Sequence, residues 1–428
     1  MPASSSNHST RRYDFLKHQL VKPLVHNHYR IRGGEDSVFE TECDLLRSAG
    51  HDVLIWEKHN NDVREDRGPF GKLSLFLGTI WNRNAYREMR AHLLADRPDV
   101  VHVHNFFPQF SPSIFWACAR EKIPVVLTLH NYRLACLNGY LYRDGTGICE
   151  KCLGKCPWAG VERRCYRNSL SASLAVAAML MVHRALGTWR HKVTRYIALT
   201  EFARGKFIEA GLPAEKIVVK PNAVKVPEGL VPMQKKPGHS PRVVYIGRLS
   251  SEKGVDVLVR AWTKLHDVTS GAELWIVGDG PERTRLEALA NNSAETHFPI
   301  RFVGAKSHDE ALALLRTSDL LVLPSVCYET FGLAVMEAAA LARLSTFGLS
   351  KTTKRRGTAA FCRQVCTTST PVARGPTWRK SVAEVVLEAS NQVVPATGTR
   401  RDPVRHVESG RVRGRHSSGY GRRSCRCS

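Results

Sequence analysis

The sequence predicts an α/β protein with two domains, each organised around a doubly wound parallel sheet. Apolar segments of strand length alternate with helical segments along the chain, and this alternation is typical of βαβ units. A chain of 428 residues that is 43% hydrophobic can bury two cores of ordinary size. The expected strands are residues 24–28, 52–58, 99–105, 124–130 and 195–200, followed by strands that begin at 243, 274, 300 and 320.

Changes in composition along the chain predict where the domains begin and end. Residues 227–241 contain four prolines and two glycines in a polar run, which is typical of a linker. The expected parts are a disordered N-terminus (1–20), a first domain (21–226), the linker (227–241), a second domain (242–341) and a basic low-complexity tail (342–428).

The net charge of +24 is unevenly distributed. Residues 341–428 hold 18 Lys or Arg against 4 Asp or Glu, so the body is only moderately basic. A moderately basic body fits an enzyme that handles diphosphates at an anionic membrane surface. No apolar run reaches the roughly 18 residues of a membrane span, and the polar N-terminus lacks the apolar core of a secretory signal. We therefore expect a cytoplasmic protein that is peripheral at the inner face of the membrane.

Residues 325–340 form the stretch around which the chain is organised. The apolar strand 320–324 runs into a polar turn, and the turn opens a helix whose first turn contains residues 330–332. A helix N-terminus presents free N–H groups and suits an anion such as a diphosphate. Glu329 and Glu337 bracket this start, either as ligands of a nucleotide-sugar or as solvated helix acids.

A second motif follows the strand at residue 243. Arg248 and Lys253 project from the loop after that strand, within the run G-R-L-S-S-E-K-G that begins at Gly247. An Arg fork and a mobile Lys charge can together neutralise a diphosphate leaving group. Taken alone, the pair could equally be two surface cations.

These motifs, in this order, resemble the retaining glycosyltransferases of the GT-B fold, and glycosyltransferase family 4 (glycosyl transferases group 1) in particular. E-T-F-G-L-A-V-M-E at 329–337 is similar to the family's E-x7-E motif, and the run from Gly247 is similar to its donor-phosphate motif. T-L-H-N-Y around His130 and the segment 217–227 also agree. The resemblance covers residues 25–341 and implies two Rossmann-like domains facing a central cleft.

The resemblance implies a role for particular side chains in sugar transfer from a UDP- or GDP-sugar to a saccharide or lipid-linked acceptor, with retention. The first domain would be the acceptor side and the second would bind the donor. No cofactor would be required for catalysis, because the two cations replace a metal. The implied catalytic residues are His130, Arg248, Lys253 and Glu329, and the implied donor-binding residues are Gly34, Arg248, Lys253, Gly278, Val303, Phe331, Gly332, Leu333 and Glu337.

Two features of the first domain leave alternatives open. Gly33 and Gly34 lie between a strand and a helix, where glycine permits close approach of a ligand or simply makes a turn. His104 and His130 follow strands, at the edge where ligands of parallel sheets bind. The resemblance favours a functional role for His130, near the reacting carbon of the donor, and leaves His104 open.

Residues 136–165 contain five cysteines among Gly, Lys and Asp. This density predicts either a structural zinc, with Cys149, Cys152, Cys156 and Cys165 as the expected ligands, or a set of reduced thiols in an ordered insertion. The insertion falls on the acceptor side of the implied fold, so we connect it with acceptor recognition or with stiffening of that domain.

The sequence departs from the family pattern after Leu341. Residues 342–428 are rich in Arg, Ser, Thr and Gly and do not supply a core. The second domain therefore lacks its last strands under either of two interpretations, and an inactive remnant is the alternative to an active enzyme. The first interpretation is a tail encoded out of register. The other is a genuine basic tail for a membrane or nucleic acid, although the sequence carries no aromatic-interleaved RNA motif and we expect no nucleic-acid partner. The leading prediction is a glycosyltransferase of surface polysaccharide or glycoconjugate biosynthesis.

Overall fold

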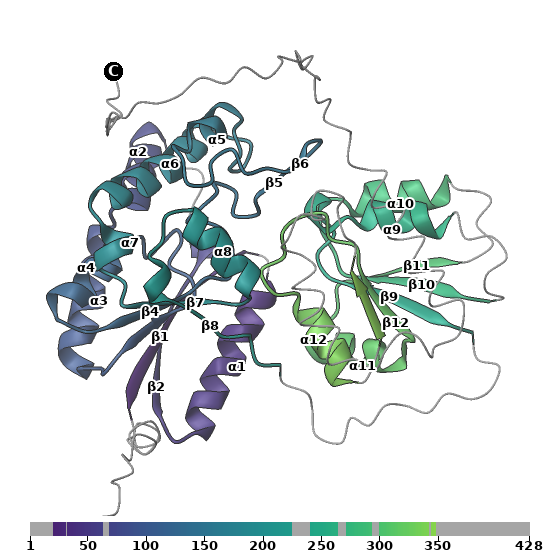
Figure 1. Ribbon diagram of the computed structural model, residues 1–428, viewed down its shortest axis with the longest axis horizontal. Coiled ribbons are helices and arrows are strands. Elements are labelled where there is room, and N and C mark those ends of the chain that lie inside the picture. The colour runs from purple at the N-terminus through teal and green to yellow at the C-terminus, as the bar shows by residue number, and fades with distance from the viewer. Residues whose placement is uncertain are drawn as a thin grey trace, which may run out of the picture. The chain divides into compact units, whose positions relative to one another are not determined.

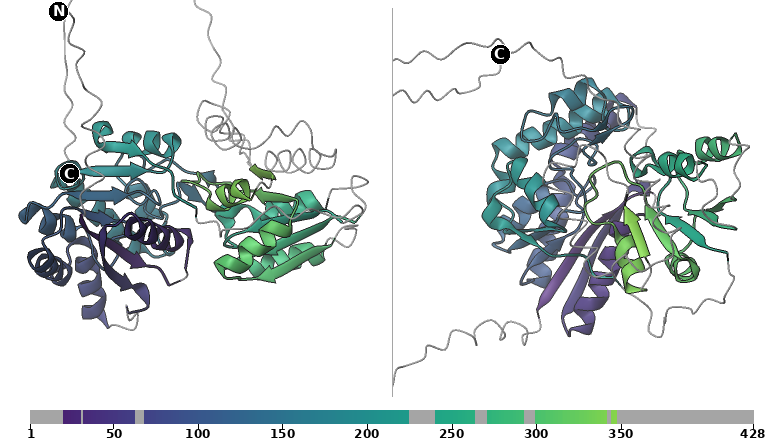
Figure 2. Two further views of the ribbon diagram at one scale, coloured as in Figure 1. Left: turned by 90° about the horizontal axis from the view of Figure 1, so that it is seen from below. Right: turned by 45° about the vertical axis from the view of Figure 1, so that its right-hand side comes forward.

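The computed structural model describes residues 20–30, 32–62, 68–224, 240–263, 271–292, 299–341 and 344–347. The expected linker and the expected disordered N-terminus lie almost wholly outside these ranges, as does the expected tail apart from residues 344–347. Figure 1 shows the described elements, and Figure 2 shows them from two other directions.

The first sheet has six parallel strands in the order β2-β1-β3-β4-β7-β8. The strands are β1 (Val21–His28), β2 (Asp52–His59), β3 (Val101–Val103), β4 (Val125–Thr128), β7 (Arg195–Ala198) and β8 (Ile217–Val219). The apolar stretches predicted from the sequence form β1, β2, β3, β4 and β7, whereas β8 was not among the predicted strands. Strands β1, β3, β4 and β7 are mostly buried, and the edge strand β2 is partly exposed.

Helices cover both faces of the first sheet, with α1 on one side and α3 and α4 on the other (Figure 1). Their bounds, with those of the remaining helical segments of this domain, are α1 (Gly34–Ser48), η3 (Asn60–Asp62), α2 (Pro69–Ile80), α3 (Arg83–Asp96), α4 (Ser113–Arg120), α5 (Trp158–Glu162), α6 (Leu170–Ala185), α7 (Thr188–His191), α8 (Glu201–Glu209) and η4 (Ala214–Lys216).

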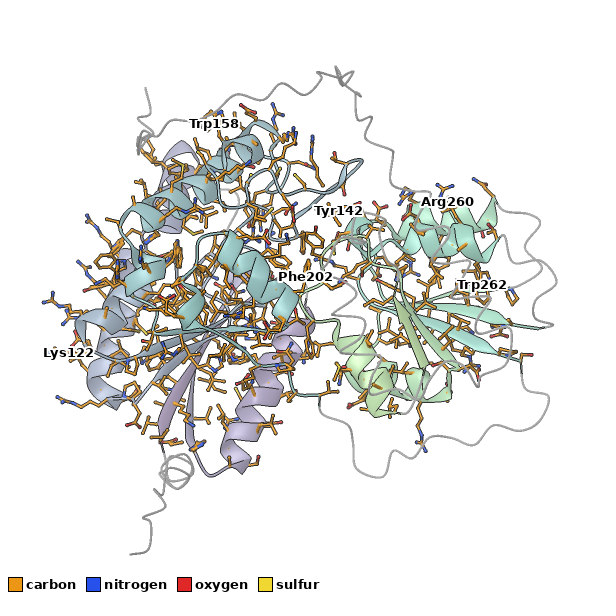
Figure 3. All side chains as sticks on the ribbon, in the orientation of Figure 1. Lys122, Tyr142, Trp158, Phe202, Arg260 and Trp262 are labelled. Atoms are coloured by element: carbon orange, nitrogen blue, oxygen red, sulfur yellow. The ribbon has the colours of Figure 1, made fainter. Side chains whose placement is uncertain are left out.

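The cysteine-bearing insertion between β4 and α6 has little regular structure. It holds a short antiparallel pair, β5 (Tyr142–Arg143) with β6 (Gly147–Ile148), and the five-residue helix α5. Figure 3 labels Tyr142 on β5 and Trp158 on α5. Turns make up most of the remaining insertion, but Leu137, Leu141 and Val161 are buried and join the core of the first domain.

The second sheet has five parallel strands in the order β11-β10-β9-β12-β13. Helices α9 and α10 lie on one side of it, and α11 and α12 lie on the other (Figure 1). The elements are β9 (Arg242–Ile246), η5 (Ser251–Lys253), α9 (Val255–Trp262), β10 (Glu273–Val277), α10 (Arg283–Asn291), β11 (Ile300–Gly304), α11 (His308–Thr317), β12 (Leu320–Leu323), α12 (Leu333–Ala340) and β13 (Leu344–Phe347). Its core is separate from that of the first domain.

Two boundaries differ from the prediction. Strand β13 pairs with β12 from Leu344 to Phe347, so the sheet continues past residue 341 into the range expected to be tail. Helix α12 begins at Leu333 and not in the turn before it, because Gly332 adopts a left-handed conformation (φ 75°, ψ 62°) that breaks the helical path. Glu329 and Glu337 are therefore not on one continuous helix.

None of the described helices has the length and apolar content that crossing a membrane requires.

Candidate functional site

Arg248 lies in the loop that follows β9. Its Nη2 donates to Glu252 Oε1 at 2.5 Å and to the hydroxyl of Tyr140, in the cysteine-bearing insertion, at 2.8 Å. Burial alone would lower the pKa of Arg248, but Tyr140 and Glu252 outweigh it and raise that pKa. The side chain is 39% exposed. The loop therefore holds a permanent cation in a fixed orientation while leaving part of it accessible.

Lys253 ends η5, five residues after Arg248. Its Nζ donates to Glu329 Oε1 at 2.7 Å, and Ser325 Oγ donates to the same oxygen at 2.5 Å. Burial opposes both charges, yet the ion pair outweighs it, so the pKa of Lys253 is raised and that of Glu329 is lowered. The structure thus brings together two residues predicted to be catalytic, 76 positions apart in the sequence.

The strand order of the second sheet explains why Lys253 and Glu329 lie close together. Strand β9 is the first strand of the domain and has β10 on one side and β12 on the other, so the direction of winding reverses between β9 and β12. Ligands of doubly wound sheets bind beyond the carboxyl ends of the strands at such a reversal. Arg248 and Lys253 follow β9, and Glu329 follows β12, so all three lie at the expected place.

The turn before α12 is anchored by three consecutive residues. Thr330 Oγ1 donates to the backbone carbonyl of His130 at 2.8 Å. Phe331 is buried with Ile197 and Leu199, at the end of β7. Gly332 then turns the chain into α12. The ring of Phe331 therefore has a packing role.

Three further residues that the resemblance assigns to donor binding, Glu337, Leu333 and Gly34, lie in α12 and at the start of α1. Glu337 lies on α12, 12% exposed, with His308 Nδ1 3.7 Å from its Oε1. Burial raises its pKa, and His308 opposes that effect. A Cβ on Gly34 would lie 2.9 Å from Leu333 Cδ1, so α1 begins in direct contact with the first residue of α12.

Gly278, which the resemblance assigns to donor binding, and Gly280 two residues later are both required by close packing of the backbone. A Cβ on Gly278 would lie 1.9 Å from the Gly247 carbonyl oxygen, and one on Gly280 would lie 2.2 Å from that of Leu249. The loops after β9 and β10 are thus in backbone contact. Val303 is half-buried in β11, and the Gly304 carbonyl after it accepts from Gly278 N at 2.8 Å.

His130 has contacts through both its ring and its backbone. Its Nε2 lies 3.0 Å from His104 Nδ1, and its carbonyl accepts from Thr330. Burial lowers the pKa of His130 to about 3, with the charges of His26 and His102 acting in the same direction. The ring is therefore neutral at physiological pH and points to His104, so any contact with a donor would involve the backbone or require the ring to turn.

Glu35 is a residue whose environment the sequence did not reveal. It lies in the first turn of α1, where its Oε1 is buried without a hydrogen-bond partner and its Oε2 is 3.5 Å from Asn131 Nδ2. Burial and the charge of Asp36 raise its pKa to about 8, although Arg133 and Arg248 oppose this. Glu35 is thus a carboxylic acid, mainly neutral at pH 7, close to the Arg248 cation.

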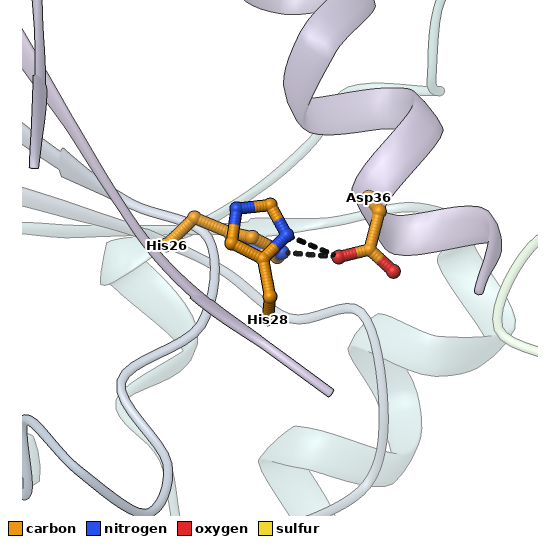
Figure 4. Close-up of side chains that lie close together, drawn as sticks. All are labelled: His26, His28 and Asp36. Atoms are coloured by element: carbon orange, nitrogen blue, oxygen red, sulfur yellow. Dashed lines mark hydrogen bonds and ion pairs between the residues drawn. The ribbon is translucent and has the colours of Figure 1, made fainter. Parts of the chain in front are cut away.

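Asp36 organises the loop before α1. Its Oδ1 accepts from His26 Nε2 at 2.9 Å and lies 2.8 Å from His28 Nδ1, and its Oδ2 accepts from Gly33 N at 2.7 Å (Figure 4). Burial opposes ionisation of Asp36, but the bonds to His26 and Gly33 outweigh it and lower its pKa. The sequence signal for this cluster is a His-x-His strand end followed by an acid in the next helix.

Three groups of His, Asp and Glu in the described residues have ligand atoms within 4.8 Å of one another. They are His26 with His28 and Asp36, His28 with Glu57 and His59, and Glu42 with His102 and His104. The first is already satisfied by His–Asp hydrogen bonds, and it gives a structural reason for these side chains without an ion.

Two family models match the chain. The model described as Glycosyltransferase Family 4 matches residues 32–226, and the model described as Glycosyl transferases group 1 matches residues 240–345. The second match runs into β13, beyond the extent of the sequence resemblance. Together with the two doubly wound domains, these matches place the chain in the GT-B class of glycosyltransferases.

Curated relatives are similar over different shares of the chain. An uncharacterised 42.6 kDa protein in the cps region of Klebsiella pneumoniae is 24% identical over 74% of this chain and 81% of its own length. An α-D-kanosaminyltransferase of Streptomyces kanamyceticus is 26% identical over 52% of this chain and 51% of its own length. A GDP-mannose-dependent mannosyltransferase of Mycobacterium tuberculosis is 42% identical, but over only 23% of this chain and 24% of its own length. The match thus spans most of the first relative, about half of the second and about a quarter of the third.

Solved structures share the fold at low sequence identity. Sucrose-phosphate synthase of Thermosynechococcus elongatus has a TM-score of 0.53 at 16% identity, covering 88% of this chain and 96% of its own. WaaG, a glycosyltransferase involved in lipopolysaccharide biosynthesis, has a TM-score of 0.51 at 17% identity, covering 86% and 90%. HepE of Anabaena, in complex with UDP-glucose, has a TM-score of 0.50 at 14% identity, covering 88% and 94%.

Proposed function

We propose that this protein transfers a sugar from a nucleotide-diphosphate-sugar to a saccharide or lipid-linked acceptor, with retention at the anomeric carbon. The observation that carries the proposal is the pair of cations, Arg248 and Lys253, at the winding reversal of the second sheet. A diphosphate is the anion that two fixed cations at a strand's carboxyl end suit best, and its negative charge grows as the sugar departs.

Each cation would exchange a carboxylate for the diphosphate. In the absence of ligand, Lys253 is paired with Glu329 and Arg248 with Glu252. A diphosphate beside the cations would compete for both side chains. Glu329, freed from part of this pairing, would accept hydrogen bonds from sugar hydroxyls, and its lowered pKa keeps it ionised for that role.

The remaining predicted residues divide between the two ends of the donor. Glu337 would accept from the ribose hydroxyls, and the backbone at residues 331–333 would bind the sugar or the phosphate next to it. Glu35 would add a hydrogen-bonding group near the sugar, because its Oε1 is buried without a partner. His130 would support the reacting carbon through its backbone, since its ring nitrogen lies against His104.

Nucleotide-dependent stabilisation tests the donor site. We expect UDP or GDP to raise the melting temperature of the purified chain, and the more effective nucleotide would identify the base. The double variant Arg248→Ala, Lys253→Ala should lose this rise. A matched double variant, Arg260→Ala with Arg301→Ala, removes two exposed cations elsewhere in the same domain and should keep it. An unchanged response in the first variant would remove the basis of the proposal.

Turnover and stereochemistry need a separate measurement. With the nucleotide identified, the anomeric proton coupling of the product, measured by NMR, should show the configuration of the donor. Inversion would contradict the proposed mechanism. Nucleotide binding without transfer or donor hydrolysis would support the inactive remnant instead.

We also propose that the protein works at a membrane surface. The exposed side of α2 carries Phe70 (89% exposed), Leu73 (55%) and Leu77 (54%), together with Lys72. An apolar helix face with a basic neighbour suits an anionic interface. Sedimentation with vesicles containing anionic lipid should retain the wild type, whereas Leu73→Glu with Leu77→Glu should release it. A polysaccharide or lipid-linked acceptor would fit this location. WaaG, which shares the fold, is involved in lipopolysaccharide biosynthesis.

A further inference from the structure

Four cysteines surround one small cavity in the insertion of the first domain. The cavity, about 10 Å³, is lined by Cys136, Cys149, Cys152 and Cys165. Cys136 is buried and the other three are half-buried. Cys156, one of the four ligands expected from the sequence, does not line it, and its Sγ lies 3.9 Å from Met181 Sδ at the surface. The four cysteines that line the cavity therefore include Cys136 and not the predicted Cys156.

Each of the four cysteines is positioned by its own turn. Cys136 N donates to the Tyr132 carbonyl at 2.8 Å, and Cys149 N donates to the Leu141 carbonyl at 2.8 Å. Cys165 N donates to the Gly160 carbonyl at 2.9 Å, and the Cys152 carbonyl accepts from Lys155 N at 3.2 Å. Twelve residues separate Cys136 from Cys149, two separate Cys149 from Cys152, and twelve separate Cys152 from Cys165. These contacts thus bring four cysteines to the lining of one cavity, with a symmetric spacing of 12, 2 and 12 residues between them.

The surroundings of the cavity favour thiolates around a cation. Arg143, Lys151 and Arg163 also line it, and their positive charges offset the two net negative charges that four thiolates and one divalent ion would carry. A Cβ on Gly160 would lie 2.6 Å from Leu137 Cδ1 and 3.4 Å from the Cys152 sulfur, so a glycine lets α5 pack closely against Leu137 beside the cavity.

We propose that Cys136, Cys149, Cys152 and Cys165 bind one structural Zn²⁺ in a closed tetrahedral site, and that Cys156 is not a ligand. In the ligand-free geometry no three of these sulfurs fall within 4.8 Å of one another. Zinc–sulfur bonds of about 2.3 Å would bring the sulfurs to roughly 3.8 Å apart. Rotation about the single side-chain torsion of a cysteine moves its sulfur by up to about 3 Å, so binding of the ion would require some of the four side chains to turn.

Such an ion would stiffen the part of the insertion that contacts the loop after β9, which carries Arg248 and Lys253. Tyr140 accepts from Arg248, and Asp144 accepts from Ser251 Oγ in η5. Both contacts come from the segment between Cys136 and Cys149. The insertion has little regular structure of its own, so a metal is an effective way to fix it.

Metal content and ligand identity test this inference without any assay of sugar transfer. The full-length chain, refolded or expressed with Zn²⁺ and freed of excess metal, should contain about one zinc per chain. Cys136→Ser should lose most of that zinc, and the matched variant Cys156→Ser should retain it. Zinc loss in Cys156→Ser with retention in Cys136→Ser would overturn the assignment, and a wild type without zinc would overturn the site.

A second measurement covers the case in which Cys136→Ser does not fold. X-ray absorption at the zinc edge of the wild type should show four sulfur neighbours near 2.3 Å and no nitrogen or oxygen. Substitution with Co²⁺ should give the visible bands of a tetrahedral thiolate site, unchanged in Cys156→Ser. A first shell containing nitrogen or oxygen would contradict the four-cysteine site.

Discussion

Glu35 gives the most direct test of the electrostatics at the first-domain side of the site. Its carboxyl group has a pKa of about 8, against 4.5 for the exposed group. Between these values the folded protein keeps a proton that the unfolded chain releases, so the free energy of unfolding falls as pH rises. One pKa unit corresponds to about 1.36 kcal/mol, so Glu35 should cost about 3 kcal/mol at pH 7 and about 5 kcal/mol above pH 8.

The substitution Glu35→Gln removes this titration while keeping the shape and the hydrogen bond to Asn131. We expect the variant and the wild type to be similarly stable near pH 4.5, and the variant to become progressively more stable than the wild type up to about pH 8. Urea denaturation followed by tryptophan fluorescence at several pH values measures the difference. Glu40→Gln, an exposed position (51%) on the same helix, is the control. A difference between Glu35→Gln and the wild type that stays constant with pH would refute the reasoning.

Three further substitutions test the scaffold by urea denaturation. Gly278→Ala should lower the free energy of unfolding by at least about 3 kcal/mol, because its Cβ would overlap the Gly247 carbonyl at 1.9 Å. The control Gly205→Ala, in open space on α8, should raise it by up to about 1 kcal/mol. Equal effects of the two substitutions would contradict the packing role of Gly278. Asp36→Asn should lower the free energy of unfolding by about 2–4 kcal/mol at pH 7. The loss should shrink as the pH falls through the lowered pKa of Asp36, because the wild type then loses the same charge. A loss independent of pH would exclude the charge as the cause. Ser307→Ala should cost about 1 kcal/mol by removing the capping box of α11, and no loss would show that solvent replaces it.

The parts of the site that local sequence determines were predictable. Arg248 and Lys253 follow one strand and Glu329 follows another, and parallel strands bring their carboxyl ends to one edge. That rule needs only strand positions and a short motif, both of which can be read from residues near the site. The fold class and the GT-B resemblance rest on the same local signals and are confirmed by the two sheets and the family matches.

Features that depend on distant contacts were not predictable. The high pKa of Glu35 comes from burial beside residues such as Arg133, about a hundred positions away. Spacing alone favoured Cys156 as a ligand because it completes a tight run, whereas the turns of the insertion direct Cys136 to the cavity. The start of α12 is set by the left-handed conformation of Gly332, and Phe331 before it packs with Ile197 and Leu199. A helix-propensity argument contains no information about that distant contact.

The carboxylate partners of Arg248 and Lys253 have a consequence for selectivity. Because Glu252 and Glu329 already neutralise the two cations, the empty site carries little net charge and attracts anions only weakly over distance. An anion gains from the site only if it can replace both carboxylates at once, which two linked phosphates can do and one phosphate or chloride cannot. Under the proposed function, these ion pairs would disfavour small single anions at the site and would make donor binding depend less on ionic strength than two bare cations would.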